Sequence, residues 1–268
     1  MRRVTLALVV ALAAGLAGCG AFDPGIGDGG SVETVTPVPV PTTAQPSPPG
    51  VTDGTVDPAA VADAHRRTLR ATNYTVSTRV RIENGSAALS VFRQTRRVAA
   101  GGERYAGEYG RNTSNPPVAL STRSVAYWTG GDGYASRHVE HGRVVYLGWS
   151  TTGEPITDVE RARAARRVLS ALSFTVAERG DDALVLTATG IRDRAALPRP
   201  RYVDGVHNVS ARVRVGFDGV VSSSRLAYDA RFADRRVRVS YETTVTDRGA
   251  TTVERPAWVD EARNRSVA

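Results

Sequence analysis

Two stretches of the sequence alternate between apolar and polar residues, and this pattern constrains the fold more than any other feature. In residues 74–82 and 237–245, every second residue is apolar apart from one threonine in each run, while all the residues between them are polar or charged. A period of two describes a strand with one buried and one wet face, which is typical of antiparallel sheets. We therefore predict an antiparallel sheet protein.

Two dipeptides indicate hairpins beside these stretches. Asn84-Gly85 and Asp218-Gly219 are typical of two-residue turns, which need positive φ angles. Closing the first turn so that apolar positions face one another sets Val80 opposite Leu89. Closing the second sets Val215 opposite Ser222 and Ala211 opposite Leu226. Each register is a definite prediction, because a slip of one residue would turn every side chain to the other face.

Two amphipathic helices accompany the strands. The first opens with Asp57 as N-cap and Pro58 at its first position, and its apolar face follows at helical spacing. The second begins at Pro155, and its apolar stripe consists of Ile156, Val159, Ala162, Ala165, Leu169 and Leu172. About ten antiparallel strands need their apolar face covered, and two such helices can cover it. We therefore predict an α+β fold.

An internal similarity divides the predicted domain. Residues 66–76 align without gaps on residues 166–176, and each segment runs from a predicted helix end into a strand. Two related halves, each a helix followed by antiparallel strands, would explain the match. Common helix-to-strand chemistry without duplication would explain it equally well, because the match covers only eleven residues.

The N-terminus has the features of an export signal that ends at a lipid attachment site. Arg2 and Arg3 precede an apolar run of thirteen residues, which is shorter than the roughly 20 that span a bilayer. Leu16-Ala17-Gly18-Cys19 matches the lipobox of lipoproteins, and Cys19 is the only cysteine. We predict a signal peptide over residues 1–18 and a lipid on Cys19, which would anchor the protein to the extracytoplasmic face of the cell membrane. An ordinary secretory signal with a chance cysteine is the alternative, and the arginine pair fits either twin-arginine or general secretion.

A proline-rich segment separates the signal from the predicted domain. Residues 19–57 hold seven of the fourteen prolines, five acidic residues and no arginine. We predict a disordered tether there and a folded domain over residues 58–268. All 35 basic residues of the chain are arginines, and 33 of them lie in the domain against 22 acidic residues. The domain therefore has a net charge of +11.

Five of the six asparagines are followed two positions later by serine or threonine, which is more than chance would supply. Such sequons accept N-linked glycans in exported proteins. We predict glycosylation at Asn73, Asn84, Asn112, Asn208 and Asn264. The alternative is that these sequons only reflect turns and strand edges.

Several segments resemble a family of haloarchaeal lipoproteins: the lipobox Cys19, Tyr74-Thr75-Val76 after the first helix, Phe217-Asp218-Gly219-Val220, and Pro256-Ala257-Trp258-Val259-Asp260-Glu261-Ala262. The architecture of that family is similar to the lipoprotein-carrier fold of LolA, LppX and LprG. The resemblance implies a curved half-barrel sheet whose concave face is closed by the helices around an apolar cavity. In the carriers that cavity holds acyl chains. The basic domain departs from the acidic surfaces usual in haloarchaea.

The sequence lacks the common catalytic motifs. It has no GxSxG nucleophile elbow, no HExxH zinc motif, no dinucleotide-binding glycine motif before a helix, no EF-hand loop and no lysine. His138 and His141 fall at a strand end and a turn, where the two rings would not share a face. We therefore expect no metal site, no cofactor and no enzymatic activity.

The arginines raise the question of a polyanionic partner. They are dispersed over the wet faces of strands and the aromatic residues form no stacking platform, so we do not expect a nucleic acid. An anionic lipid or glycan surface is available outside the cell. The second helix could approach it with Arg161, Arg163, Arg166 and Arg167. The alternative is a helix surface on which these arginines pair with Glu154, Asp158 and Glu160.

The predicted function is the binding or transfer of an apolar, lipid-like ligand by a membrane-anchored lipoprotein. The alternative is a structural or protein-interaction module of the cell surface that has no ligand. The candidate ligand-binding residues lie on apolar faces and could equally fill a close-packed core. They are Tyr74, Val76, Val80, Leu169, Leu172, Val213, Val215, Val239 and Tyr241. The sequence does not indicate an oligomeric state.

Overall fold

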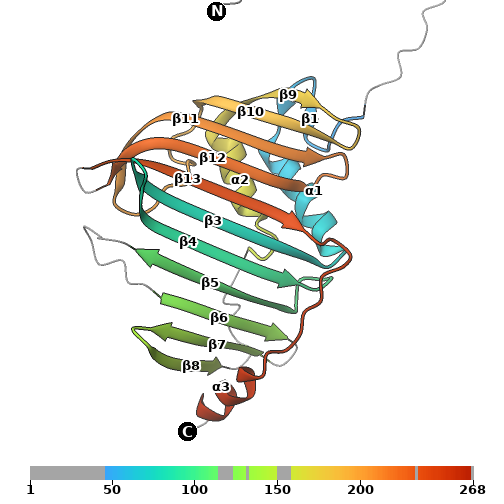
Figure 1. The fold of residues 1–268 in the computed structure, drawn as a ribbon. Helices are drawn as coiled ribbons and strands as arrows, with labels where there is room; N and C mark the ends of the chain where they lie inside the picture. The colour runs from blue at the N-terminus through green and yellow to red at the C-terminus, as the bar shows by residue number, and fades with distance from the viewer. Residues whose placement is uncertain (1–45, 114–122, 131–132, 150–157, 233–234, 267–268) are drawn as a thin grey trace, which may run out of the picture. The chain divides into compact units, whose positions relative to one another are not determined.

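The computed structural model describes residues 46–113, 123–130, 133–149, 158–232 and 235–266. These residues form an α+β fold with one large antiparallel sheet, a small hairpin and three helices (Figure 1). The predicted fold class is confirmed, and the sheet has eleven strands where about ten were expected. None of the described helices is long and apolar enough to cross a membrane. In chain order the elements are β1 (Val51–Thr52), β2 (Thr55–Val56), α1 (Pro58–Arg70), β3 (Tyr74–Asn84), β4 (Ala87–Val98), β5 (Tyr105–Thr113), β6 (Arg123–Gly130), β7 (Gly133–Glu140), β8 (Arg143–Trp149), α2 (Ala162–Ala171), β9 (Leu172–Arg179), β10 (Ala183–Ile191), β11 (Val203–Gly216), β12 (Val221–Phe232), β13 (Arg235–Thr246) and α3 (Trp258–Ser266).

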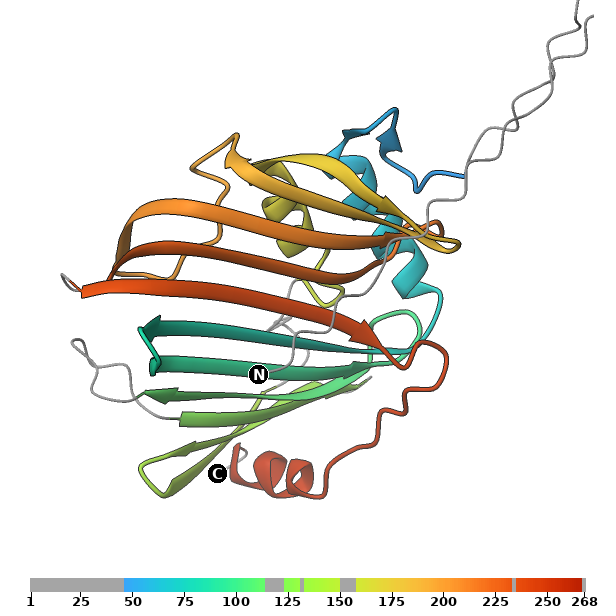
Figure 2. The ribbon, with the colours of Figure 1, turned by 45° about the horizontal axis from the view of Figure 1, so that its top comes forward.

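The large sheet consists of two meanders that join at its centre. Strands β3 to β8 follow one another from the centre to one edge, and β9 to β13 return from the other edge to the centre, where β13 pairs with β3. Helix α1 precedes the first meander and α2 precedes the second. Each half is therefore a helix followed by antiparallel strands, as the repeat suggested. Among the described strands, β8 and β9 form the two edges, so the sheet is open, and Figure 2 shows its curvature.

The two predicted hairpin registers have different outcomes. In the β11–β12 hairpin Ala211 lies opposite Leu226, as predicted, but next to the turn Val215 lies opposite Val221 and not Ser222, because the register shifts between Arg214 and Val215. In the β3–β4 hairpin Val80 lies opposite Phe92, so the predicted pairing with Leu89 is wrong. Two local features cause the difference. Asn84 pairs with Ala87, so the turn consists of residues 85–86 and not of the predicted residues 84–85. A β-bulge between Ile82 and Glu83 then shifts the register once more.

Helix α1 begins where the sequence indicated. The Asp57 carboxylate accepts two backbone N–H groups of the first turn, at 2.8 and 3.2 Å, and Pro58 is the first helical residue. The β11–β12 turn lies directly against this helix. Gly219 has a φ of +85°, and a Cβ there would lie only 2.7 Å from the Cβ of Ala64. The glycine therefore permits the close approach that places α1 beside the sheet.

Helix α2 begins later than predicted. Residues 155–156 lie outside the described residues, and the helix runs over Ala162–Ala171. Arg161 adopts a left-handed conformation with a φ of +65°, which turns the chain into the helix at this point. Leu172, expected at the end of the apolar stripe of the helix, is the first residue of β9. The helix is therefore shorter at both ends than the stripe suggested.

The main hydrophobic cluster lies between the helices and the second meander. Val61 of α1 and Leu169 of α2 are almost completely buried, and they belong to one cluster with Leu184, Val213 and Val239 of the strands. Helices α1 and α2 therefore cover the concave face of the sheet, as predicted, and Figure 1 shows them behind strands β9 to β13. Burial of these apolar faces is the main stabilising contribution to this half of the sheet.

A third helix, which the sequence did not reveal, packs on the opposite face. Val259 and Ala262 of α3 are fully buried against Trp128 of β6 and Ala135 of β7. Side chains alternate along β6, so Trp128 points away from the face that holds its neighbour Tyr127. Few apolar residues of α3 face the sheet, so its amphipathic pattern is too weak to predict a helix. The sheet therefore has helices on both faces, at opposite ends.

The last part of the predicted tether is structured. Residues 51–56 form the β1–β2 hairpin, and Val51 is 2% exposed within the main hydrophobic cluster. Asp53 and Gly54 both have positive φ, as a tight hairpin turn requires. The prediction of disorder up to residue 57 is therefore wrong for these residues. The hairpin is too short to produce a visible hydrophobic period, and burial of a few side chains is enough to order it.

Candidate functional site

Two cavities lie on the concave face, on either side of Tyr241. The first, called the α2 cavity, has a volume of about 390 Å³ and lies between α2 and strands β3, β12 and β13. The second, called the strand-end cavity, has a volume of about 540 Å³ and lies over β3, β4, β12 and β13. The α2 cavity is lined by His65, Thr78, Asp158, Arg161, Arg163, Ala164, Ala165, Arg167, Val168, Pro198, Arg199, Val221, Ser224, Leu226, Tyr241, Thr243 and Val245. The strand-end cavity is lined by Val80, Ile82, Ser90, Phe92, Arg111, Pro200, Arg201, Tyr202, Phe232 and Tyr241.

One loop contributes to both cavities. The residues before β11 supply Pro198 and Arg199 to the α2 cavity and Pro200 to the strand-end cavity. The Tyr228 hydroxyl donates a hydrogen bond to the carbonyl oxygen of Pro198 at 3.0 Å, which ties the loop to the sheet. An elongated ligand that passes Tyr241 under this loop would therefore contact both cavities.

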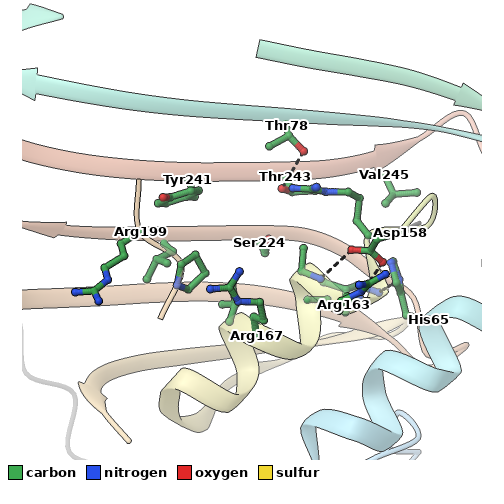
Figure 3. Close-up of a pocket in the computed structure, with 17 residues that line it drawn as sticks. His65, Thr78, Asp158, Arg163, Arg167, Arg199, Ser224, Tyr241, Thr243 and Val245 are labelled. Atoms are coloured by element: carbon green, nitrogen blue, oxygen red, sulfur yellow. Dashed lines mark hydrogen bonds between the residues drawn. The ribbon is translucent and has the colours of Figure 1, made fainter. Parts of the chain in front are cut away.

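The strand side of the α2 cavity is apolar with a few hydroxyl groups. Val221 and Leu226 form part of its floor, while Thr78 and Thr243 lie side by side with their Oγ1 atoms 3.3 Å apart (Figure 3). Burial raises the pKa of Tyr241 to about 12. Its hydroxyl is therefore neutral at physiological pH, and this wall offers hydrogen bonds without charge.

The α2 side of this cavity is charged. Arg161 is the residue before α2, Arg163 lies in the first turn of the helix, and Arg167 lies near its middle. The Asp158 carboxylate accepts the backbone N–H of Arg163 at 2.9 Å and that of Ala164 at 3.1 Å, so it caps the N-terminus of the helix. Burial lowers the pKa of the Arg161 guanidinium, and the nearby positive charge of Arg96 acts in the same direction.

His65 holds three elements together at one end of the α2 cavity. The backbone N–H of Val221 donates to its Nδ1 at 3.1 Å, so Nδ1 must be an unprotonated acceptor. The proton therefore resides on Nε2, which donates to the carbonyl oxygen of Glu160 at 2.9 Å. Burial lowers the pKa of His65, in agreement with this neutral form. The ring thus joins α1, β12 and the segment before α2.

Two arginines, one on β4 and one on α1, also hold the segment before α2. Arg96 of β4 is 2% exposed, and its guanidinium donates to the carbonyl oxygens of Val159 at 2.7 Å and Asp158 at 3.2 Å. Arg70 of α1 donates from Nε to the buried carboxylate of Glu160 at 2.7 Å. The start of α2 is therefore fixed to both the sheet and α1, and the position of the cavity wall follows from these bonds.

The structure separates the nine candidate ligand-binding residues into two groups. Val80 lines the strand-end cavity and Tyr241 lines both cavities. The other seven do not line these cavities but fill hydrophobic clusters: Leu169, Leu172, Val213, Val215 and Val239 lie in the main cluster, and Tyr74 and Val76 in a second one. Their alternation along the strands could not distinguish a cavity from a packed core, because both need apolar side chains.

Sequence reasoning did not connect the arginines with a cavity. Of the four that were expected to approach a membrane surface, Arg161, Arg163 and Arg167 line the α2 cavity, whereas Arg166 is exposed and does not line it. The expected alternative partners act elsewhere: Glu154 lies outside the described residues, Asp158 caps the helix, and Glu160 pairs with Arg70. A usable signal was present in Thr78 and Thr243, the threonines that interrupt the apolar faces of their strands.

The predicted modification sites differ in accessibility. Cys19 and the signal peptide lie outside the described residues. Asn112 and Asn264 are exposed. The Nδ2 groups of Asn84 and Asn208 already donate hydrogen bonds, at 2.7 and 2.9 Å, and the Oδ1 atom of Asn73 is buried. Attachment of a glycan would therefore disturb the structure least at the two exposed asparagines.

The two histidines weighed as metal ligands belong to different local structures. His138 lies on β7, where its Nε2 atom is 2.9 Å from the hydroxyl of Ser136. His141 lies in the following turn with a φ of +49°. In the part of the chain that the structure describes, no group of three or more His, Cys, Asp or Glu residues is arranged to hold a metal ion.

Comparisons with known proteins show a general architectural likeness. No protein-family model matches the sequence, and no curated protein is significantly similar to it. A DUF1329 family protein from Desulfovibrio piger matches with a TM-score of 0.29 and 8% identity, over 75% of this chain and 94% of that one. A LolA superfamily protein from Nitrosomonas europaea matches with a TM-score of 0.26 and 10% identity, over 75% and 96% of the two chains. A chain of the Pseudomonas aeruginosa MucA/MucB complex matches with a TM-score of 0.22 and 10% identity, over 69% and 94%.

At TM-scores this low, the likeness carries no argument about function. The description of the fold rests on the sheet and helices of this chain itself. The resemblance to haloarchaeal lipoproteins stays a prediction.

Proposed function

We propose that this protein is a membrane-anchored, extracytoplasmic lipoprotein that binds or transfers an apolar, lipid-like ligand and catalyses no reaction. The observation that carries the proposal is the pair of cavities that meet at Tyr241 on the helix-covered face. Their volumes, about 390 and about 540 Å³, fall within the range of roughly 300–1,000 Å³ typical of ligand sites.

The strand-end cavity suits an apolar chain. Val80, Ile82, Phe92 and Phe232 line it with aliphatic and aromatic groups, and Arg111 and Arg201 add two guanidinium groups to the lining. Each methylene group that leaves water for such a surface contributes about 0.8 kcal/mol to binding. A ligand with an acyl or similar chain would therefore be bound mainly by hydrophobic contact.

The polar groups of the α2 cavity support binding more than catalysis. Both ring nitrogens of His65 are engaged by backbone groups, and the Asp158 carboxylate is engaged by the helix N-terminus. A general base needs a lone pair within reach of the substrate. His65 therefore has no free nitrogen lone pair, and each carboxylate oxygen of Asp158 already accepts a helix N–H, so both residues hold the wall in place.

Anchoring and export are proposed from the N-terminal sequence. The lipobox places Cys19 where a lipid would be attached, and two acyl or alkyl chains give stable membrane binding where one gives only marginal binding. N-linked glycans at Asn112 and Asn264 would agree with an extracytoplasmic location, since both side chains are exposed. A lipid anchor would keep the cavities close to a membrane that contains apolar ligands.

Native mass spectrometry tests the proposal. The whole chain with Cys19→Ser, which cannot carry a covalent lipid at that position, is purified without detergent. We expect an additional mass of a lipid that organic solvent removes. Val80→Glu places a carboxylate in the strand-end cavity and should abolish the adduct, whereas Val144→Glu changes an exposed residue of β8 and should retain it. Absence of any lipid, even after incubation with lipid extracts, would contradict the proposal and favour the interaction module.

A further inference from the structure

Arginines outnumber acidic residues around the α2 cavity. Arg161 precedes α2, Arg163 and Arg167 lie on that helix, and Arg199 comes from the loop before β11. Among the described residues that line the cavity, Asp158 is the one acid. The lining therefore has a clear excess of positive charge next to an apolar floor.

The single carboxylate compensates this charge only in part. Asp158 accepts two backbone N–H groups at the start of α2, at 2.9 and 3.1 Å, and so compensates the helix end. The Nε atom of Arg161 is buried without a hydrogen-bond partner. In the described part of the chain, Arg167 and Arg199 form no ion pair. A buried guanidinium such as that of Arg161 is unfavourable when a donor lacks a partner. A bound anion would supply charge-assisted hydrogen bonds to Arg161 and to the exposed Arg167 and Arg199.

The opposite wall completes an amphipathic site. The hydroxyl groups of Thr78, Thr243 and Ser224 lie across the cavity from the arginines of α2, as Figure 3 shows. Hydroxyl groups can donate hydrogen bonds to phosphate or carboxylate oxygens. Beyond Tyr241, the aromatic ring of Phe92 begins the apolar lining of the strand-end cavity. Arg111 and Arg201 also line the strand-end cavity, but Val80, Ile82, Phe92 and Phe232 give it the apolar surface on which a chain would lie.

We propose that the α2 cavity binds the anionic head of an amphiphile, a phosphate or a carboxylate, while its apolar chain extends past Tyr241 into the strand-end cavity. This inference rests on the proposed function and names the ligand class for the same site. The planar guanidinium group suits such a head, because its N–H donors match the spacing of carboxylate and phosphate oxygens. A neutral lipid would form no charge-assisted hydrogen bonds with Arg167 and Arg199 and would bind more weakly.

Three probes that share parts of one structure test this inference. Lysophosphatidic acid with one oleoyl chain has both the anion and the chain, mono-oleoylglycerol has the chain without the phosphate, and glycerol phosphate has the anion without the chain. Binding to the whole chain with Cys19→Ser is measured by thermophoresis below the micelle concentration of each lipid. We expect lysophosphatidic acid to bind at least about tenfold more tightly than mono-oleoylglycerol, and glycerol phosphate to bind weakly.

Two matched double variants test whether the arginines of the α2 cavity cause the preference for lysophosphatidic acid over mono-oleoylglycerol. Arg167→Gln with Arg199→Gln removes two exposed arginines of the cavity mouth, and Arg166→Gln with Arg236→Gln removes two exposed arginines that do not line it. The first pair should lower the preference for lysophosphatidic acid about tenfold and leave mono-oleoylglycerol binding unchanged. The second pair has the same loss of charge and should keep the preference. Thermal unfolding of both pairs verifies that they are folded.

The possible failures are distinguishable. Equal affinity for lysophosphatidic acid and mono-oleoylglycerol would overturn the inference that the α2 cavity binds an anionic head group, and it would leave the proposed function intact. Equal loss of preference in both double variants would also overturn it, because the effect would then come from net charge. Tight binding of glycerol phosphate alone would indicate a site for a free anion and would overturn the amphiphile. Binding of none of the three probes would count against this inference and against the proposed function.

Discussion

His65 should make the stability of the domain depend on pH in a defined window. The folded protein holds the ring neutral through its bonds to Val221 and Glu160, and burial lowers its pKa below the ordinary 6.5. The unfolded chain takes up a proton near pH 6.5, whereas the folded chain does so only at lower pH. Stability is therefore complete above this pH and falls as the pH decreases through it. The slope approaches about 1.4 kcal/mol per pH unit for one proton.

Urea unfolding at a series of pH values between about 7.5 and about 5.5 measures this slope. His65→Gln keeps a donor and an acceptor but cannot titrate, so its curve should lack the contribution of this residue. The difference between the two curves then isolates His65 from the carboxylates. His207→Gln changes an exposed histidine of β11 and serves as the control. A difference between wild type and His65→Gln that stays constant over this pH range would refute the assignment of a buried neutral ring.

Three further predictions concern the helix end, the core and the anchor. Asp158→Ala removes the acceptor for two N–H groups of α2 and should lower the free energy of unfolding by about 1 kcal/mol. Asp158→Asn should retain part of this stability. Equal stability of Asp158→Ala and wild type would contradict the capping role. Leu169→Ala should destabilise the domain by about 2–5 kcal/mol in urea unfolding, since this side chain is 1% exposed. If it loses less stability than Val144→Ala, which changes an exposed residue, the helix does not pack as described. Cys19→Ser should move the protein from the membrane fraction to the soluble fraction, and unchanged sedimentation with membranes would exclude this residue as the anchor.

The sequence predicted the sheet because an alternation of apolar and polar residues arises in any strand that has one buried and one exposed face. β3 and β13 show the clearest alternation, and they pair with each other at the centre of the sheet. The Asp218-Gly219 dipeptide located the β11–β12 turn, but a register shift between Arg214 and Val215 separates the turn from the part of the hairpin whose register was predicted correctly. The Asn84-Gly85 turn is followed by Ser86 and Ala87, small residues that allow more than one turn position, so the sequence alone did not decide between registers.

The cavities could not be predicted in the same way. Whether an apolar residue such as Leu169 or Val80 meets a cavity depends on how far α2 and the loop before β11 stand from the sheet. That distance is set by long-range bonds, such as those of His65 and Arg96 to the segment before α2, which no local pattern reveals. Helix α3 was missed for a related reason, because its position depends on contact with the distant Trp128.

The pairing of β3 with β13 has a consequence for how the domain is made. β3 is eleven residues long, and its partner on one side becomes available only when the chain has been synthesised through residues 235–246. Until then the first meander presents an open hydrogen-bonding edge, and such edges recruit other strands. A nascent or clipped polypeptide that ends before β13 is thus expected to aggregate or to be degraded, and β3 can gain this partner only after residues 235–246 have left the ribosome.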